Sequence, residues 1–316
     1  MTEGTITTDV NKVCASGMKS TMLAAQTIML GHRKVMVSGG MECMSQTPHY
    51  AFLRKPSGFG DSNLPDSIKY DALTDVYNQI LMGSCTEKTA TDFNISRQAQ
   101  DEFAIESYNR ARKAQESGVL AWEIADVIIE GKKGSVKISK DEECQKFLPE
   151  KFAGLKPAFA KNGTITAANS SKINDGACAF VLMSEDAAKE RGLKPLARIV
   201  SFDDGAVAPI DFPIAPAKAV QGALARAGLT MKDIEYHEIN EAFSAVVLAN
   251  MKLQDLDHKK VNVHGGAVAL GHPVGMSGAR IILSLINVLR TQNATLGMAS
   301  ICNGGGGASA IIIERM

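Results

Sequence analysis

The sequence predicts a layered α/β protein made of two similar halves, and three observations lead to this fold class. Apolar, β-branched segments alternate with helical patterns before residue 44 and after residue 162. Residues 44–161 lack that alternation and begin with polar turns, so we interpret them as an insertion that covers the site. A loop, a helix and a strand follow one another near both ends of the chain, which indicates two related units facing one site.

Composition excludes several classes of function. The chain has 316 residues, 45% of them hydrophobic, and its 34 Lys and Arg balance 34 Asp and Glu. Zero net charge favours neither nucleic acid nor an anionic membrane as a partner, and no apolar run approaches the ~20 residues of a membrane span. The six cysteines form no CxxC pair and are typical of reduced thiols in an intracellular protein. The first residues match neither a signal peptide nor a transit segment.

The first unit places a cysteine at a helix start. Thr5–Val10 is β-branched and predicts a strand, a helix should run to about Leu30 before Gly31, and Val35–Gly40 predicts a short buried strand. Cys14 falls at the turn into the helix, where the helix dipole and free N–H groups favour a thiolate. The alternative is a core cysteine that packs at the helix start.

The insertion carries its own local structure. Ser96–Ser117 has an amphipathic pattern that predicts a long helix. Asp126–Glu130 and Val136–Ile138 flank glycines and predict a hairpin. Taken alone, Tyr108 would be a core residue of the helix.

The rest of the chain returns to alternating elements. A polar loop over 163–176 leads into a strand at Ala177–Met183. We then expect strand Leu196–Phe202, helix Pro216–Ala227 ending at Gly228, strand Ile234–Glu238, a helix from Asn240 to Leu253, strand Val261–Val263, helix Ala279–Leu289, and strands Leu296–Ile301 and Ala308–Ile313.

Glycine-rich stretches hold the residues that could do chemistry. His272 lies in the loop His264–Gly278, whose glycines permit close approach by other groups ahead of an apolar helix. Cys302 precedes a run of four glycines, and Cys14 lies beside Gly17. A cysteine, a histidine and a second cysteine in such surroundings indicate nucleophilic acyl chemistry.

Other motifs are excluded by their context. The glycine run after Cys302 precedes a strand, so it is not a dinucleotide fingerprint, and His237-Glu238 lacks the second histidine of a zinc-protease helix. No metal-ligand spacing is evident. Besides the three residues above, Asn240 lies in a turn where it could orient a water molecule.

Over its whole length the chain resembles the thiolase family, most of all its short-chain, biosynthetic branch that acts on acetoacetyl-CoA. The matching motifs are Asn11-Lys-Val-Cys-Ala-Ser-Gly-Met-Lys, Gly39-Gly-Met-Glu, Asn240-Glu-Ala-Phe, Gly265-Gly-Ala-Val-Ala-Leu-Gly-His-Pro-Val-Gly-Met-Ser-Gly and Cys302-Asn-Gly-Gly-Gly-Gly.

The resemblance implies a layered α/β/α fold of two βαβαβαββ halves with a loop domain inserted in the first. The expected boundaries are 1–43, completed by 162–190, for the N-terminal half, 44–161 for the loop domain that binds coenzyme A, and 191–316 for the C-terminal half. Only 13 residues precede Cys14, whereas a βαβ unit needs ~30. We therefore expect the first half to be incomplete, with an open sheet edge.

The resemblance also implies a role for each catalytic residue. Cys14 would be the nucleophile that carries the acetyl group, and His272 would take its proton. His272 and a water held by Asn240 would form one oxyanion site, while the backbone N–H groups of Cys14 and Gly304 would form the other. Cys302 would move the α-proton of the second substrate.

Ligand contacts are implied in the same way. Coenzyme A thioesters would be the substrates rather than a tightly bound cofactor, and the residues expected to contact them are Met82, Tyr108, Lys151 and Ser171. A potassium ion would be held mainly by backbone carbonyls, and the expected positions are Tyr108, Ala167, Ala168, Ser170 and Val268.

The expected activity is that of an acetyl-CoA C-acetyltransferase, which joins two acetyl-CoA by a ping-pong Claisen condensation or runs the thiolytic reverse. A longer-chain 3-ketoacyl-CoA thiolase is one alternative. A shortened, inactive paralogue that partners complete thiolase chains is another. By resemblance we also expect a homodimer or homotetramer and a mitochondrial location, with a cytoplasmic one as the alternative.

Overall fold

The computed structural model describes residues 2–55, 58–132 and 134–316. Its α-helices are α1 (Ser16–Met29), α2 (Met82–Asp92), α3 (Arg97–Glu116), α4 (Glu185–Glu190), α5 (Ala215–Ala227), α6 (Ser244–Gln254), α7 (Ala267–Leu270) and α8 (Val274–Thr291). Its strands are β1 (Val35–Cys43), β2 (Thr74–Asp75), β3 (Ile80–Leu81), β4 (Val127–Ile129), β5 (Val136–Ile138), β6 (Asp175–Met183), β7 (Ala197–Ala206), β8 (Tyr236–Ile239), β9 (Leu296–Asn303) and β10 (Gly307–Arg315). No helix in these ranges is long and apolar enough to cross a membrane.

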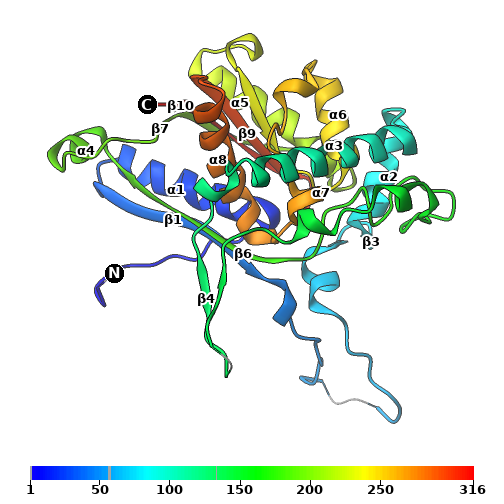
Figure 1. Cartoon of the computed structure of the whole chain (residues 1–316). Coiled ribbons are helices and arrows are strands. Elements are labelled where there is room, and N and C mark those ends of the chain that lie inside the picture. Colours follow the sequence, from blue (N-terminus) through cyan, green and yellow to red (C-terminus); the bar gives the residue numbers. More distant parts are fainter. Residues whose placement is uncertain (1, 56–57, 133) are drawn as a thin grey trace.

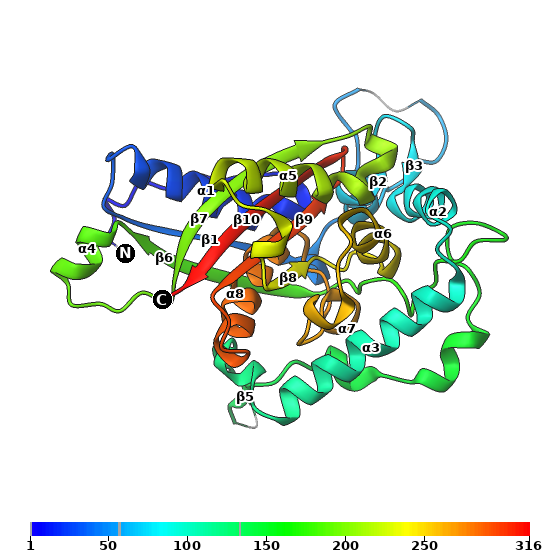
Figure 2. The same cartoon turned by 90° about the horizontal axis from the view of Figure 1, so that it is seen from above.

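The C-terminal half is built on one sheet, whose strand order within the described ranges is β7-β10-β9-β8. Strands β8 and β9 are parallel, and the other neighbours are antiparallel. Helix α5 covers one face, while α1 and α8 cover the other (Figures 1 and 2). Successive side chains of β10 point to opposite faces of the sheet and so contribute to a hydrophobic core on each face. Ile312 packs in the core under α5, and Ile311 and Ile313 pack in the core under α8.

The N-terminal half has a smaller sheet, in which β1 pairs only with β6 in the part of the chain that the structure describes. The two strands run antiparallel from Val35 opposite Met183 to Cys43 opposite Asp175. Helices α1 and α8 pack on one face, so they lie between the two sheets (Figure 1). The first strand is longer than predicted and only half-buried, since Val37 is 53% exposed.

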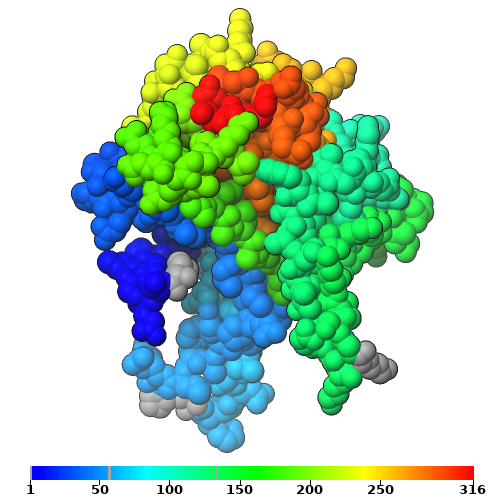
Figure 3. Space-filling view, turned by 60° about the vertical axis from the view of Figure 1, so that its left-hand side comes forward, coloured from blue at the N-terminus to red at the C-terminus, as the bar shows by residue number. Residues whose placement is uncertain are grey.

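The inserted segment adds helices beside the C-terminal half and a projecting hairpin. Helix α3 begins as predicted, because the Ser96 side chain accepts a hydrogen bond from the N–H of Ala99 at 3.1 Å. It packs against α6 and α7. The predicted hairpin forms from β4 and β5, and it extends from the body of the molecule together with the segment around residue 60 (Figures 1 and 3).

Two predicted strands are absent from the described ranges. Thr5–Val10 has no regular structure and is almost entirely exposed, because β-branched residues form a strand only where a partner strand is present. Val261–Val263 is also not a strand; Val261 forms one isolated bridge to His237.

Helix α6 starts later than predicted, at Ser244 rather than Asn240. The N–H of Asn240 instead donates to the carbonyl of Ser300 at 3.0 Å, which continues the parallel pairing of β8 with β9. Phe243 is still extended, with φ −145° and ψ 151°. Residues 240–243 therefore form a loop at the carboxyl end of β8.

Candidate active site

Cys14 lies in a tight turn that leads into α1. The turn is a short 3-10 helix, Val13–Ala15, and Val13 has φ 50°, a left-handed conformation that is rare for a β-branched residue. Ser16 braces the turn, because its Oγ accepts from the N–H of Lys12 at 2.8 Å and donates to the carbonyl of Val13 at 2.6 Å. The half-buried Cys14 thiol is thus held at the helix start, as predicted.

The backbone amides of Gly304 and of Cys14 itself lie near the sulfur of Cys14. Burial raises the pKa of this thiol to about 11, while hydrogen bonds from the N–H groups of Gly304 and of Cys14 itself act in the opposite direction. Gly304 lies in the turn between β9 and β10, close to the segment that holds the cysteine. A Cβ added to Gly304 would be 3.9 Å from Cγ1 of Val13 and 3.7 Å from Sδ of Met82.

Helices α1 and α8 cross at a pair of glycines, and this crossing brings their N-terminal ends together. A Cβ on Gly17 would be 2.8 Å from the backbone N of Ala279, and one on Gly278 would be 2.6 Å from that of Met18. Neither position leaves room for a side chain. The turn that carries Cys14 packs on α8 as a result (Figure 1).

His272 is buried between α7 and α8 and is held in one tautomer. Its Nδ1 lies 2.6 Å from Oγ of Ser277, whose own hydroxyl donates to the carbonyl of Pro273 at 2.8 Å. Nδ1 therefore carries the proton, and the lone pair of Nε2 faces Nδ2 of Asn240 at 3.5 Å. Burial lowers the pKa of His272 to about 3, with a smaller effect of the nearby Arg280, so the imidazole is neutral and Nε2 keeps its lone pair.

Cys302 is buried at the end of β9, in a cluster with Met82, Cys85, Ala242 and Phe212. Burial raises its thiol pKa, and the proximity of Cys14 raises it further. A thiolate at Cys14 therefore disfavours ionisation of Cys302.

Asn240 joins this group through the pairing of β8 with β9. Its Oδ1 is buried and has no hydrogen-bond partner among the described residues. The structure thus gathers Cys14, Cys302, Gly304 and Met82 in one place, and His272 beside Asn240 in another part of the same site.

The other three residues expected to contact coenzyme A differ from one another in location and burial. The N–H of Ser171 donates to the carbonyl of Ala242 at 3.0 Å, next to the Asn240 loop. Tyr108 is buried on α3, stacked on Phe147 with ring centroids 4.8 Å apart. Lys151 is exposed on the surface of the inserted segment.

A lysine side chain fills the place where a potassium ion was expected. Tyr108, Ala168 and Val268 share one cluster, while Ala167 is exposed. Nζ of Lys172 donates to the carbonyl of Ser170 at 2.7 Å and to that of Val268 at 3.4 Å. Burial lowers the pKa of Lys172 to about 8, against the raising effect of Glu143 and Glu241, so the group is protonated at neutral pH. These residues do not fit a potassium ion beside the ammonium.

Sequence reasoning assigned no role to Ser277, Lys172 or Glu241. Ser277 lies five residues after His272, in the first turn of α8. This short spacing is the one feature of the sequence that could have indicated a contact between the two side chains. Glu241 is buried and accepts hydrogen bonds from Oγ of Ser107 at 2.7 Å, Nδ2 of Asn262 at 2.9 Å and the N–H of Val268 at 3.0 Å. It therefore ties α3 and α7 to the Asn240 loop.

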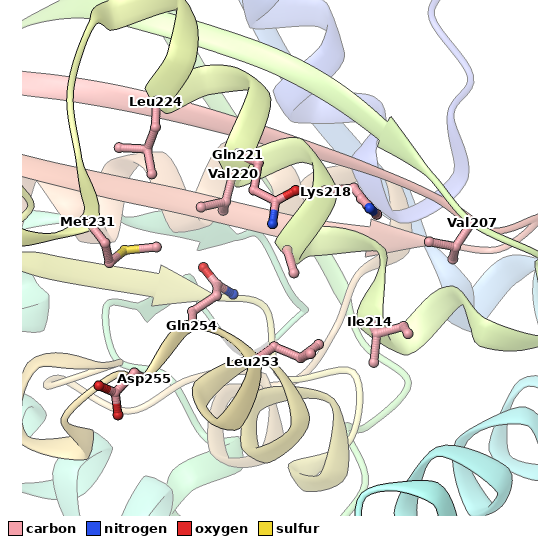
Figure 4. A pocket seen from close by; sticks show the side chains of 11 residues that line it. Val207, Ile214, Lys218, Val220, Gln221, Leu224, Met231, Leu253, Gln254 and Asp255 are labelled. Atoms are coloured by element: carbon pink, nitrogen blue, oxygen red, sulfur yellow. The ribbon is translucent and has the colours of Figure 1, made fainter.

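A hollow of about 490 Å³ lies between α5 and the end of α6 (Figure 4). Side chains of Lys218, Gln221, Leu253 and Gln254 line it, and none of the predicted site residues does. Its walls hold no nucleophile next to a base, so we place the candidate active site at the cysteines and His272.

Comparisons with known proteins identify the family of the chain. Residues 1–186 match the model of the thiolase N-terminal domain, and residues 193–315 match that of the thiolase C-terminal domain. Mitochondrial acetyl-CoA acetyltransferase B of Xenopus laevis is 56% identical over 314 residues, which cover 99% of this chain and 74% of the relative.

Solved structures agree with the sequence matches. The Acat5 thiolase of Ascaris suum, determined in complex with coenzyme A, superposes with a TM-score of 0.91 at 46% identity, over 97% of this chain and 78% of that one. Human mitochondrial 3-ketoacyl-CoA thiolase gives a TM-score of 0.93 at 38% identity with the same coverage. The predicted fold is confirmed, and the protein belongs to the thiolase family.

Proposed function

We propose that the protein is an acetyl-CoA C-acetyltransferase that works through an acetyl group carried by Cys14. The observation that carries this proposal is a cysteine held in the turn at a helix start, beside the backbone of Gly304 and close to the second cysteine, Cys302. The names of the relatives support acetyl-CoA as the substrate.

In the first step, Nε2 of His272 takes the proton of the Cys14 thiol. The thiolate attacks the carbonyl carbon of acetyl-CoA, so that a carbon–sulfur bond to Cys14 forms as the one to coenzyme A breaks. The proton on His272 then passes to the leaving thiolate of coenzyme A. The N–H groups of Cys14 and Gly304 stabilise the oxyanion of the acetylated cysteine when it is attacked in the second step, each worth about 2.7–4 kcal/mol.

In the second step, the thiolate of Cys302 removes the α-proton of another acetyl-CoA. The carbanion attacks the acetyl group on Cys14, forming a carbon–carbon bond and releasing the Cys14 thiolate, which takes up the proton that Cys302 removed. A water bound by Asn240, beside His272, stabilises the enolate oxygen. The unpartnered Oδ1 of Asn240 supports such a water site.

Coenzyme A is proposed to lie along the inserted segment, with Met82, Tyr108, Lys151 and Ser171 in contact with it. The exposed ammonium of Lys151 suits a phosphate. We propose that the protein forms a homodimer or homotetramer and that it is mitochondrial. The names of the relatives support the mitochondrial location.

The experiment is thiolysis of acetoacetyl-CoA and of longer 3-ketoacyl-CoA by the purified chain. Activity on acetoacetyl-CoA should vanish in Cys14→Ser and persist in Cys43→Ser, which changes an exposed cysteine on β1. A preference for longer substrates would favour the alternative of a 3-ketoacyl-CoA thiolase. The similarity to the human mitochondrial 3-ketoacyl-CoA thiolase, at 38% identity, is the reason to test this alternative. A chain that unfolds cooperatively yet turns over neither substrate would favour the inactive-partner alternative.

A further inference from the structure

Lys172 lies between the two loops of the candidate active site. The residue before it, Ser171, bonds to the carbonyl of Ala242 in the Asn240 loop. The carbonyl of Lys172 itself accepts from the N–H of His272 at 2.9 Å. The backbone of Lys172 therefore helps to fix the backbone position of His272.

The side chain of Lys172 turns away from solvent into a group of backbone oxygens and an aromatic ring. Its Nζ donates to the carbonyls of Ser170 and Val268, and it lies 5.8 Å from the ring centroid of Tyr108. Carbonyl oxygens and a ring face are what a monovalent cation would use, and an ammonium suits them because it has three donors and a charge. A second cation within hydrogen-bond distance of the same oxygens would be strongly repelled in this half-buried place.

The ammonium acts on the catalytic loop through Val268. The N–H of Val268 donates to the buried carboxylate of Glu241, and its carbonyl accepts from Lys172. Helix α7 is thus held through the N–H and the carbonyl of one residue by groups of opposite charge, and His272 follows two residues after this helix. Loss of either charge should loosen the loop and misplace the imidazole.

We propose that Lys172 is a built-in replacement for a monovalent cation, a positioning residue that holds α7 and the His272 loop without a bound ion. The chain should therefore work at full rate without potassium. Removing the side chain should create a cavity of carbonyls that potassium can occupy.

The test compares the purified chain with Lys172→Ala, Lys172→Met and the control Lys161→Ala, which changes an exposed lysine on a nearby loop. Thermal unfolding and thiolysis of acetoacetyl-CoA are both measured in potassium chloride and in choline chloride at equal ionic strength. The thiolysis measurement rests on the proposed function, whereas the unfolding measurement does not.

The wild type and Lys161→Ala should respond equally to the two salts. Lys172→Ala should lose about tenfold in kcat with little change in KM in choline chloride, the scale expected when hydrogen bonds of a charged group are removed. Potassium should restore most of that rate and raise its Tm by about 2–4 °C. Lys172→Met, whose side chain still fills the space without a charge, should lose activity and gain nothing from potassium.

Stimulation or stabilisation of the wild type by potassium, relative to choline, would overturn the proposal. So would a Lys172→Ala variant that matches Lys161→Ala in both salts. If Lys172→Ala does not fold, the responses of the wild type and of Lys172→Met still decide. A wild type without thiolase activity would refute the proposed function, and the unfolding curves would still test the built-in cation.

Discussion

Replacing Ser277 with alanine tests whether the orientation of His272 controls catalysis. The Oγ atom of Ser277 lies 2.6 Å from Nδ1 of the imidazole and is its only described hydrogen-bond partner there. Removing it leaves a buried N–H without an acceptor, which costs about 1–3 kcal/mol. The cost is greatest when the ring becomes an imidazolium, so it should raise the barrier to acyl transfer and lower kcat/KM by about 5- to 150-fold.

The assay is thiolysis of acetoacetyl-CoA, with the rate of Cys14 alkylation by iodoacetamide as a second readout. Ser284→Ala is the matched control, because Ser284 is also a buried serine on α8, and it donates to Glu123 at 2.9 Å rather than to the histidine. Both variants should lose some stability, while only Ser277→Ala should lose activity and slow alkylation. Equal kcat/KM values for the two variants would refute the reasoning.

Three further predictions concern two residues of the site and one ion-paired aspartate on β7. Cys302→Ala should leave acetylation of Cys14 intact but lower thiolysis by at least about 100-fold, because it removes a general acid; equal losses in both steps would contradict this. Glu241→Gln should lower the free energy of unfolding in urea by about 2–3 kcal/mol, since one amide oxygen cannot accept three donors; an unchanged midpoint would count against it. Burial raises the pKa of Asp204, but hydrogen bonds from Lys12, Lys19 and Ser309 outweigh it and lower the pKa to about 2. The folded pKa is below the unfolded one, so this stabilisation is present above pH ~4 and is lost as pH falls toward 2. After screening it amounts to about 1 kcal/mol, and Asp204→Asn should flatten the dependence measured by urea unfolding between pH 5 and pH 3.

Local signals in the sequence predicted most of the elements. Gly228 ends α5 with φ 66°, and Ser96 caps α3, and both were visible as single residues at the expected places. The strand predicted at Thr5–Val10 failed because propensity says nothing about whether a partner strand is present.

The catalytic residues could be proposed from motifs, but their contacts could not. The meeting of Cys14 with Gly304 depends on how two ends of the chain pack, which no local pattern encodes. Lys172 reaches Val268 across 96 residues, and it reads as a surface lysine in the sequence. Only the folded chain brings its ammonium to the carbonyls of Ser170 and Val268.

The measurement that tests the central claim most directly is the intact mass of the chain after incubation with acetyl-CoA, followed by mapping of the modified peptide. We expect one acetyl group, located on Cys14, absent in Cys14→Ser and lost when free coenzyme A is added. A folded chain that takes up no acetyl group, or one whose acetyl group persists in Cys14→Ser, would contradict the account.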